Sequence, residues 1–515
     1  MNSLSFSKQI SSWVLFILLV VVCLLLYKDY GISWDEPVQR GIGRLAYDYV
    51  NNRNPEYMQM QDRIYGVGFE LPLIALENFF NLTDTRDVYL LRHLVNALFF
   101  SLACFIFYRM NLRLFDKTII ALVPTLMLIF SPRIFGHAFF NSKDLPFMCM
   151  GIFCFHALHK YLLKPSWLHL IILSMLAGML INFRIMGILF VGIAVVILGV
   201  NAFQKKELKT WLSVPIFLVI AGITLYSTWP FLWDAPVKHF KEAYVSMSKF
   251  PWNGEMLFKG EVITTGKRQA EYLFTWIGIT VPVLYLVMSL AGLVVFIISQ
   301  LKHFKQMLDS PQKLIGWAAL VQFAAPIAAV IVLKSVLYDE WRQLYFIYPF
   351  LILFSGFLMQ YAWNKKPAVT LTIFIVIAAY IGLIGLRMVN LHPYEQVYFN
   401  ETVPKKKEYI AEHYEMDYWG TSFYEGLKYL TEVDHSDTIP LFMFHSALKR
   451  NVMLLPEKDR KRIYFPQGEG AEAKSRYYLT TRRFDKVDII GHSHYKEIIF
   501  TVERENSAIL RIWKH

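Results

Sequence analysis

The chain has 515 residues, of which 55% are hydrophobic and only 18% are charged, and its formal net charge is +12. A soluble globular protein carries about 25% charged residues. This composition therefore excludes a soluble multidomain protein, a disordered chain and a coiled coil. The cysteines (Cys23, Cys104, Cys149 and Cys154) all lie in apolar runs, which excludes a disulfide-stapled secreted scaffold.

Apolar runs in the sequence predict a polytopic α-helical membrane protein. A helix needs about 20 apolar residues to cross a bilayer. We identify eleven such runs, with approximate ends at 11–27, 88–108, 118–134, 145–161, 167–183, 186–203, 210–229, 272–299, 314–334, 343–363 and 367–387. The first run has no small-residue cleavage site after it, so we expect an uncleaved anchor.

Loop charges predict the orientation of these helices. Alternate short loops are basic, and their residues are Arg109, Arg113, Lys117, Lys160, Lys164, Lys205, Lys206, Lys209, Lys302, Lys305, Lys313, Lys365 and Lys366. The positive-inside rule places these loops in the cytoplasm, with the N-terminus inside and the C-terminus outside. Much of the net charge is thus a topology signal, and we expect no nucleic-acid partner.

The other side of the membrane receives the longer segments. We expect a transmembrane domain over 1–387, with a first outer loop over 28–87, and an extracytoplasmic α/β domain over 388–515. In the first loop, two amphipathic stretches, 38–49 and 69–80, predict helices that lie along the membrane surface or pack against the helical body. In the tail, the pattern predicts a helix over 417–430 and strands over 439–444, 462–465, 476–480, 498–502 and 508–513.

Polar groups stand at the predicted outer ends of the helices. Asp35 and Glu36 follow the first run. A carboxylate in this place can act as a general base, bind a metal or accept a hydrogen bond from a sugar hydroxyl. The alternative is that Asp-Glu-Pro begins a helix, which is also common.

The segment 131–144 concentrates ionisable side chains between two apolar runs. Such residues are costly near a bilayer and usually face a cavity or a partner. Arg133 and Lys143 are candidate phosphate ligands, Asp144 is a candidate acidic site residue, and His137 and Asn141 are candidate sugar contacts. The alternative is an internally paired loop.

Three further segments complete the candidates. Arg184 has no acidic neighbour in the sequence, so it can bind an anionic head group or a lipid phosphate. Arg342 is a second candidate phosphate clamp, but it can also pair with Asp339, itself a candidate sugar contact, or with Glu340. The aromatic segment 229–236 is either an interfacial belt, which we expect for Trp229, or a platform under a sugar, for which Trp233 is the candidate.

Phosphate-loop, dinucleotide-binding and HExxH motifs are absent from the sequence, so cytoplasmic nucleotide chemistry is unsupported.

The chain resembles the GT-C superfamily of membrane glycosyltransferases, and within it the group of protein O-mannosyltransferases and lipid A aminoarabinose transferases. The resemblance rests on Asp35-Glu36 after the first run, on Asn141-Ser142-Lys143-Asp144 after the third, and on the segments 341–349, 392–400 and 418–422.

This resemblance implies a hexosyl- or pentosyltransferase that uses a polyprenyl-phosphate-linked monosaccharide on the extracytoplasmic side, with inversion. Asp35 would be the base, Glu36 would position donor or acceptor, and Asp144 would be a second acidic residue. Fixed cations stabilise the negative charge of a departing phosphate. Lys143, Arg184 and Arg342 are positively charged and lie on the predicted outer side, so we expect them near the phosphate of the lipid donor. The acceptor would be a lipid, glycan or protein, and the expected location is a bacterial inner membrane.

Metal dependence stays open; a divalent metal is possible but not favoured. A flippase for a lipid-linked glycan is the alternative function, although transporters usually place ionisable groups near mid-membrane and show internal repeats. A non-catalytic assembly or sensor protein, working through its tail, is the third hypothesis.

Overall fold

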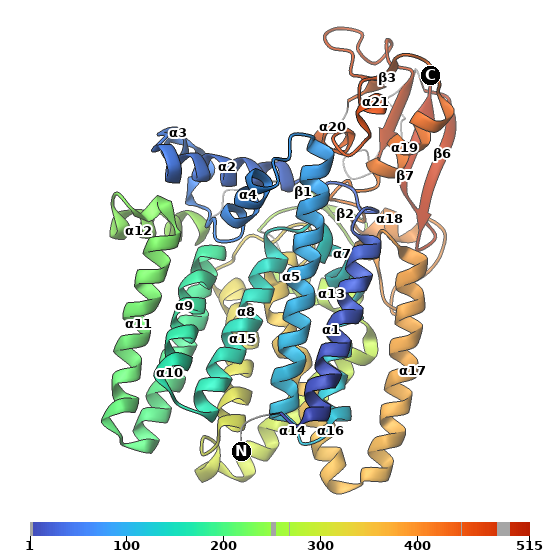
Figure 1. Cartoon of the computed structure of the whole chain (residues 1–515). Coiled ribbons are helices and arrows are strands. Elements are labelled where there is room, and N and C mark those ends of the chain that lie inside the picture. The colour runs from blue at the N-terminus through green and yellow to red at the C-terminus, as the bar shows by residue number, and fades with distance from the viewer. Residues whose placement is uncertain (1–3, 249–253, 267, 444, 482–494) are drawn as a thin grey trace.

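A computed structural model describes residues 4–248, 254–266, 268–443, 445–481 and 495–515. It consists of a body of roughly parallel helices and a C-terminal sheet domain that stands on one end of that body, away from the N-terminus (Figure 1). We call this end the sheet end and the other the N-terminal end. The fold class predicted from the sequence, a polytopic helical protein with a C-terminal α/β domain, is confirmed.

Each predicted apolar run lies on a helix or on a pair of helices. The helices of the body are α1 (Phe6–Leu26), α5 (Thr85–Leu114), α6 (Thr118–Ile129), α7 (Pro132–Phe140), α8 (Asp144–Leu163), α9 (Trp167–Phe183), α10 (Ile188–Lys205), α11 (Leu208–Thr228), α13 (Gln269–Thr280), α14 (Val283–Lys302), α15 (Pro311–Val332), α16 (Tyr348–Lys365) and α17 (Pro367–Leu391). In the described part of the chain, eight helices are long and apolar enough to span a membrane, or nine if the bent pair α6–α7 is one span. The eleven spans and their orientation stay predictions.

Two predicted straight runs are broken at prolines. The run 118–134 bends by 59° between α6 and α7, and 272–299 divides at Val281-Pro282 into α13 and α14. Proline lacks the backbone N–H that a continuous helix needs, and its ring clashes with the preceding turn, so it breaks or kinks a helix interior. At the start of a helix neither problem arises, and proline is tolerated there. The bend at Pro132 turns the fully buried α7 inward and places the polar segment 133–144 inside the protein.

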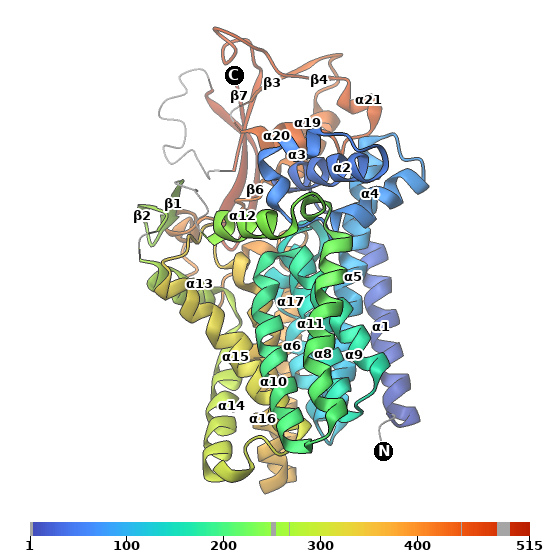
Figure 2. The same ribbon diagram turned by 90° about the vertical axis from the view of Figure 1, so that its left-hand side faces the viewer.

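The first loop lies across the sheet end of the body. It contains α2 (Glu36–Asn52), α3 (Glu56–Gln59) and α4 (Glu70–Phe79), and it packs with α12 (Pro236–Ser248) above the vertical helices (Figure 2). Both predicted amphipathic stretches are helices. Ile42 and Ala46 are buried in one cluster with Trp229 and Phe231, so this face of α2 packs against the protein. The interfacial belt expected for Trp229 is wrong, because the ring is fully buried.

The sheet domain has five strands in the order β4-β3-β5-β7-β6, with β3 parallel to β4 and β5 and the other pairs antiparallel. Its strands are β3 (Ile439–Phe442), β4 (Ile463–Tyr464), β5 (Tyr477–Thr480), β6 (Glu497–Arg504) and β7 (Ser507–Lys514), and its helices are α18 (Tyr409–His413), α19 (Phe423–Val433), α20 (Ser446–Val452) and α21 (Glu457–Arg460). All five predicted strands are confirmed, although Phe444 lies outside the described residues. A hairpin of β1 (Glu255–Phe258) and β2 (Glu261–Thr264) was not predicted.

The helix predicted over 417–430 begins six residues late, at Phe423. Asp417 instead accepts hydrogen bonds from the backbone of Thr421 and Ser422, and Gly420 has a left-handed φ of 69°. Glycine adopts this conformation without the steric cost that a side chain imposes. The resulting loop directs Tyr418 and Trp419 into the helical body.

Candidate active site

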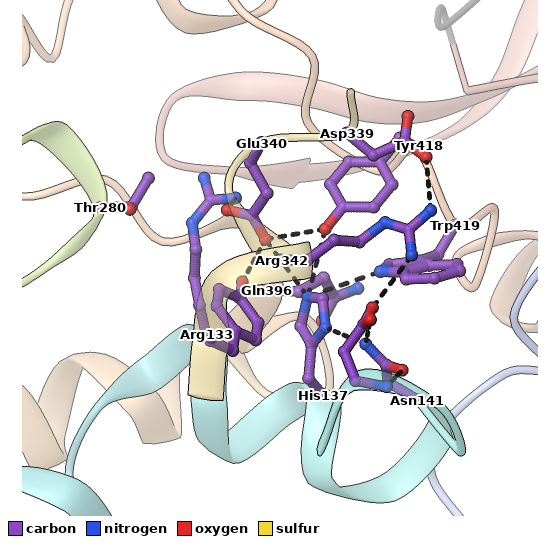
Figure 3. Close-up of polar contacts among 12 residues, drawn as sticks. Arg133, His137, Asn141, Thr280, Asp339, Glu340, Arg342, Gln396, Tyr418 and Trp419 are labelled. Carbon is purple, nitrogen blue, oxygen red and sulfur yellow. Dashed lines mark hydrogen bonds and ion pairs between the residues drawn. The ribbon is translucent and has the colours of Figure 1, made fainter. Parts of the chain in front are cut away.

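Polar side chains from five segments meet at the sheet end of the helical body. They come from the start of α2, from α7 with the α7–α8 turn, from the 3-10 helix η5 (Arg342–Ile347) with the residues before it, from the α9–α10 junction and from the 418–419 loop (Figure 3 shows part of this group). They form two adjacent clusters that share few contacts. We call them the Asp35 cluster (Asp35, Asp144, Arg184, Asp339 and Arg342) and the Glu340 cluster (Arg133, His137, Glu340, Tyr345 and Tyr418).

Arg342 is the centre of the Asp35 cluster. Its Nη1 lies 3.0 Å from Asp144 and 3.6 Å from Asp35, and its Nη2 lies 3.2 Å from Asp339. The guanidinium carbon lies 4.6 Å from the ring centroid of Trp419, within the range of a cation–π contact. With three carboxylates around it, Arg342 is placed to orient acidic groups, which differs from the phosphate clamp predicted from the sequence.

Asp144 is held by two arginines, Arg184 and Arg342, and by the turn that precedes α8. Its carboxylate pairs with Arg184 and Arg342 and accepts a hydrogen bond of 3.1 Å from the amide of Asn141. The Asn141 carbonyl oxygen accepts the backbone N–H of Asp144, and its amide also lies 3.0 Å from His137 Nδ1. Asn141 therefore closes this turn, as an asparagine side chain commonly does at a helix start. Through its contact with His137 it also links the two clusters.

Asp35 differs from the other acids in its exposure. Its side chain is 24% exposed, against 1% for Asp144 and 7% for Asp339. Of the carboxylates in the two clusters, it is therefore the one that a molecule from outside can reach most easily. Glu36 turns elsewhere: it accepts the backbone N–H of Ser33 at 2.7 Å and lies 3.0 Å from His93 Nε2, so its contacts are those of a buried helix start.

The Glu340 cluster is sealed from solvent. Glu340 binds Arg133 Nη1 at 2.6 Å, accepts the hydroxyl of Tyr418 at 2.7 Å, contacts the hydroxyl of Tyr345 and lies 3.4 Å from His137 Nε2. Burial opposes ionisation of Glu340, but Arg133 and hydrogen bonds from His137 and Tyr345 outweigh it and lower the pKa to about 2. Glu340 is thus an ionised, fully partnered acid. The sequence missed this pairing.

Arg133 belongs to this sealed cluster. It donates to the carbonyl of Tyr398 at 2.9 Å, and its guanidinium lies over the rings of Trp276 and Phe399. Its side chain is 3% exposed. The predicted role of Arg133 as a phosphate ligand does not fit this burial.

A groove of about 240 Å³ adjoins the Asp35 cluster. Apolar side chains of α10 and α15 form much of its wall, and Lys143, Arg184, Tyr65 and Tyr338 lie along its lining; the apolar residues are Ile185, Met186, Ile188, Leu189, Met247, Pro326, Ala329, Val330, Leu333, Val336, Leu337 and Leu344. The arrangement is an apolar channel with a cationic patch beside three carboxylates. Such a shape suits an amphiphile with an anionic head.

The two cations of the groove are held differently. Arg184 pairs with Asp144, whereas Lys143 has no ion pair within the described residues and its Nζ lies 4.3 Å from the ring centroid of Tyr65. Desolvation by burial, opposed by the charge of Asp35, lowers the pKa of Lys143 to about 8. Burial and the nearby Arg342 lower the pKa of Arg184 to about 10. Both groups would gain from an anionic partner.

No family model and no curated protein matches this sequence. Solved structures do match. The oligosaccharyltransferase of Archaeoglobus fulgidus, in complex with zinc and sulfate, aligns over 94% of this chain and 71% of its own, with a TM-score of 0.51 and 10% identity. The same enzyme tethered to an acceptor peptide has a TM-score of 0.50 at 11% identity, over 93% of this chain and 70% of its own. The chain has the GT-C fold.

A third structure with the GT-C fold is the aminoarabinose transferase ArnT from Cupriavidus metallidurans, bound to undecaprenyl phosphate. It aligns over 97% of this chain and 98% of its own, with 12% identity and a TM-score of 0.45. At such low identity the likeness to the oligosaccharyltransferase establishes the fold alone, and the roles of individual residues have to be argued from the geometry of this chain.

On the GT-C fold, most of the candidates from the sequence come together. Asp35, Lys143, Asp144, Arg184, Asp339 and Arg342 lie in or beside the Asp35 cluster, and His137 and Asn141 lie next to it. Trp233 is elsewhere: it packs on Tyr49 and Arg53 and donates its Nε1–H to the carbonyl of Tyr226. Within the described residues, no group of three His, Cys, Asp or Glu side chains is arranged to hold a metal ion.

Proposed function

We propose that this chain transfers a monosaccharide from a polyprenyl-phosphate-linked donor to an acceptor hydroxyl, with inversion at the anomeric carbon. The observation that carries the proposal is the groove: its apolar walls lead to Lys143 and Arg184, beside the most exposed carboxylate of the Asp35 cluster. A lipid chain needs the apolar walls, its phosphate needs the cations, and a transferred sugar needs the neighbouring acids.

In this proposal the donor phosphate binds at Lys143 and Arg184. The bond between the anomeric carbon and the phosphate oxygen breaks, and the departing polyprenyl phosphate gains negative charge. Fixed cations in a site of low dielectric stabilise such charge without having to reorganise. Lys143 suits this role because it has no ion pair within the described part of the chain that would have to be broken first.

Asp35 is the proposed general base. The acceptor oxygen attacks the anomeric carbon from the face opposite the phosphate, and its proton moves to the Asp35 carboxylate. Asp144, Asp339 and Glu340 are largely buried, whereas the Asp35 side chain is 24% exposed, so Asp35 is the most accessible proton acceptor. Arg342, 3.6 Å from Asp35, orients this carboxylate, and Asp144 positions Arg342 and Arg184.

We further propose that the sheet end is extracytoplasmic and that the location is a bacterial inner membrane, as the loop charges predict. The tail beyond residue 387 then forms the extracytoplasmic domain, and it contributes Tyr418 and Trp419 to the site. The acceptor is a lipid, glycan or protein of the cell envelope.

A transfer assay with a groove-blocking variant tests the proposal. Ala329 lines the groove, whereas its neighbour Ala328 on the same helix is exposed and outside the lining. With a panel of radiolabelled polyprenyl-phosphate sugars and envelope extract as acceptor, the wild type and Ala328→Trp should move label from one donor into product, and Ala329→Trp should not.

Equal transfer by the two tryptophan variants would refute the groove as the donor site. Lipid movement across sealed vesicles that depends on this protein, with no glycosidic product from any donor, would replace the transferase with the flippase.

A further inference from the structure

A second crevice lies near the N-terminal end of the helical body, far along α8 from the Asp35 cluster. It is formed by the C-terminal half of α5, the last turns of α8 and the first turns of α9, and its volume is about 260 Å³. Its walls are mostly apolar, and its polar residues, His156, Lys160 and His169, lie toward the helix ends; the apolar residues are Leu102, Ile106, Phe153, Ala157, Ile172 and Leu176.

The polar end of this crevice carries positive charge that the described residues do not neutralise. Arg109 and Arg113 of α5 lie within Coulombic range of His156 and Lys160. Arg113 donates to the carbonyl of Arg109, and Arg109 lies over the ring of Phe105. In the described part of the chain, neither arginine nor Lys160 pairs with a carboxylate. Like charges gathered beside an apolar surface repel one another more strongly than in water.

One more polar atom points to a ligand. The Nδ1 atom of His156 is buried and has no hydrogen-bond partner within the described residues. A buried polar nitrogen without a partner is costly, and here it stands beside three cations and an apolar channel. A single molecule with an anionic head and a hydrocarbon chain would satisfy the imidazole, the charges and the walls together.

We propose that this crevice binds one anionic phospholipid, with its phosphate at His156, Lys160 and Arg113 and an acyl chain along the apolar walls. Charge complementarity selects the anionic lipid over a zwitterionic one. The crevice shares no lining residue with the donor groove, so this site is independent of the proposed transferase function.

Native mass spectrometry of the full-length protein in detergent tests the assignment. We expect phosphatidylglycerol to be retained as one tightly bound copy, in preference to phosphatidylcholine. Loss of one basic residue near a membrane surface costs about 1 kcal/mol, so Lys160→Gln and Arg113→Gln should each weaken retention about fivefold. Lys366→Gln, which removes an exposed charge from the same end of the body outside the crevice, should leave retention unchanged.

A steric variant separates this site from general attraction to a charged membrane. Ile106→Trp keeps every charge but fills the crevice, and it should also release the lipid. Equal retention of the two phospholipids by the wild type, or full retention by Ile106→Trp, would overturn the proposal. So would displacement by millimolar inorganic phosphate, which would indicate a free anion, or a preference for undecaprenyl phosphate over phosphatidylglycerol.

Discussion

The Asp35 cluster and the Glu340 cluster are built from the same residue types, and both lie at the sheet end of the helical body, but they differ in burial and pairing. In the Glu340 cluster, the carboxylate has an arginine, a histidine and two tyrosine hydroxyls around it and no exposed surface. In the Asp35 cluster, one acid is 24% exposed and one arginine borders an open groove. We therefore interpret the sealed arginine–carboxylate pairs as structural and propose that the open ones take part in chemistry.

The first way to test this contrast is to neutralise the open acid. Asp35→Asn keeps the size of the side chain but cannot accept the acceptor proton, and loss of a general base lowers turnover by about 10²- to 10⁴-fold. The melting temperature should fall less than in a variant of the sealed cluster, because Asp35 is partly exposed and Arg342 keeps its pairs with Asp144 and Asp339. Initial rates and thermal unfolding of the purified protein check both. Wild-type turnover by this variant would remove Asp35 from the mechanism.

In the sealed Glu340 cluster, we expect a substitution to lower the stability of the protein. Glu340→Leu leaves Arg133 buried without its partner, which costs about 3–5 kcal/mol of stability. The double variant Arg133→Met/Glu340→Leu removes both charges and should recover much of the lost melting temperature. An unchanged melting temperature in Glu340→Leu would show that the cluster is not structural.

The pH dependence of stability sharpens the same point. The pKa of Glu340 falls from its ordinary value of 4.5 to about 2 in the folded protein. A lowered folded-state pKa contributes stability above pH 4.5, and this contribution is lost as the pH falls toward 2. Thermal unfolding from pH 6 to 2 should therefore show a smaller loss of stability in the double variant than in the wild type.

A smaller effect is expected at the groove. Lys143→Gln removes a charged donor to the phosphate, a contact worth about 1.5–3 kcal/mol, so the KM for the donor should rise about 10- to 100-fold. The Lys143 pKa of about 8 adds a pH signature: the ammonium is charged below pH 8 and loses its charge above it. Donor KM should rise from pH 7 to 9 in the wild type more than in Lys143→Arg. Equal pH profiles would exclude Lys143 from phosphate binding.

The smallest effect is expected where the tail meets the site. Trp419→Leu removes the ring beneath Arg342, a cation–π contact worth about 1 kcal/mol, so kcat/KM should fall about fivefold. Trp419→Phe keeps an aromatic face and should lose less. Equal losses in the two variants would mean that the Trp419 Nε1–H contact with His137 matters more than the ring.

Local patterns predicted much of the fold. Each apolar run lies on a helix or a helix pair, and the five strands of the tail lie where alternating apolar residues indicated them. Three errors fall where a proline or a polar cap changes the backbone: Pro132 bends α7 inward, Pro282 divides α13 from α14, and Asp417 delays α19. Such breaks depend on how the freed backbone groups find partners, which the hydrophobic pattern does not record.

The sequence by itself determined which residues carry charge at the ends of apolar helices, and so the membrane-protein class and the five members of the Asp35 cluster. Only the tertiary structure decided how these charges pair: that Arg133 binds Glu340, that Arg342 stands among three aspartates, that Glu36 turns to His93, and that Trp419 enters from the tail. The reason is physical. Hydrophobic periodicity is a local property of a helix or strand, whereas an ion pair can join residues that are far apart in the chain and leaves no periodic trace in it.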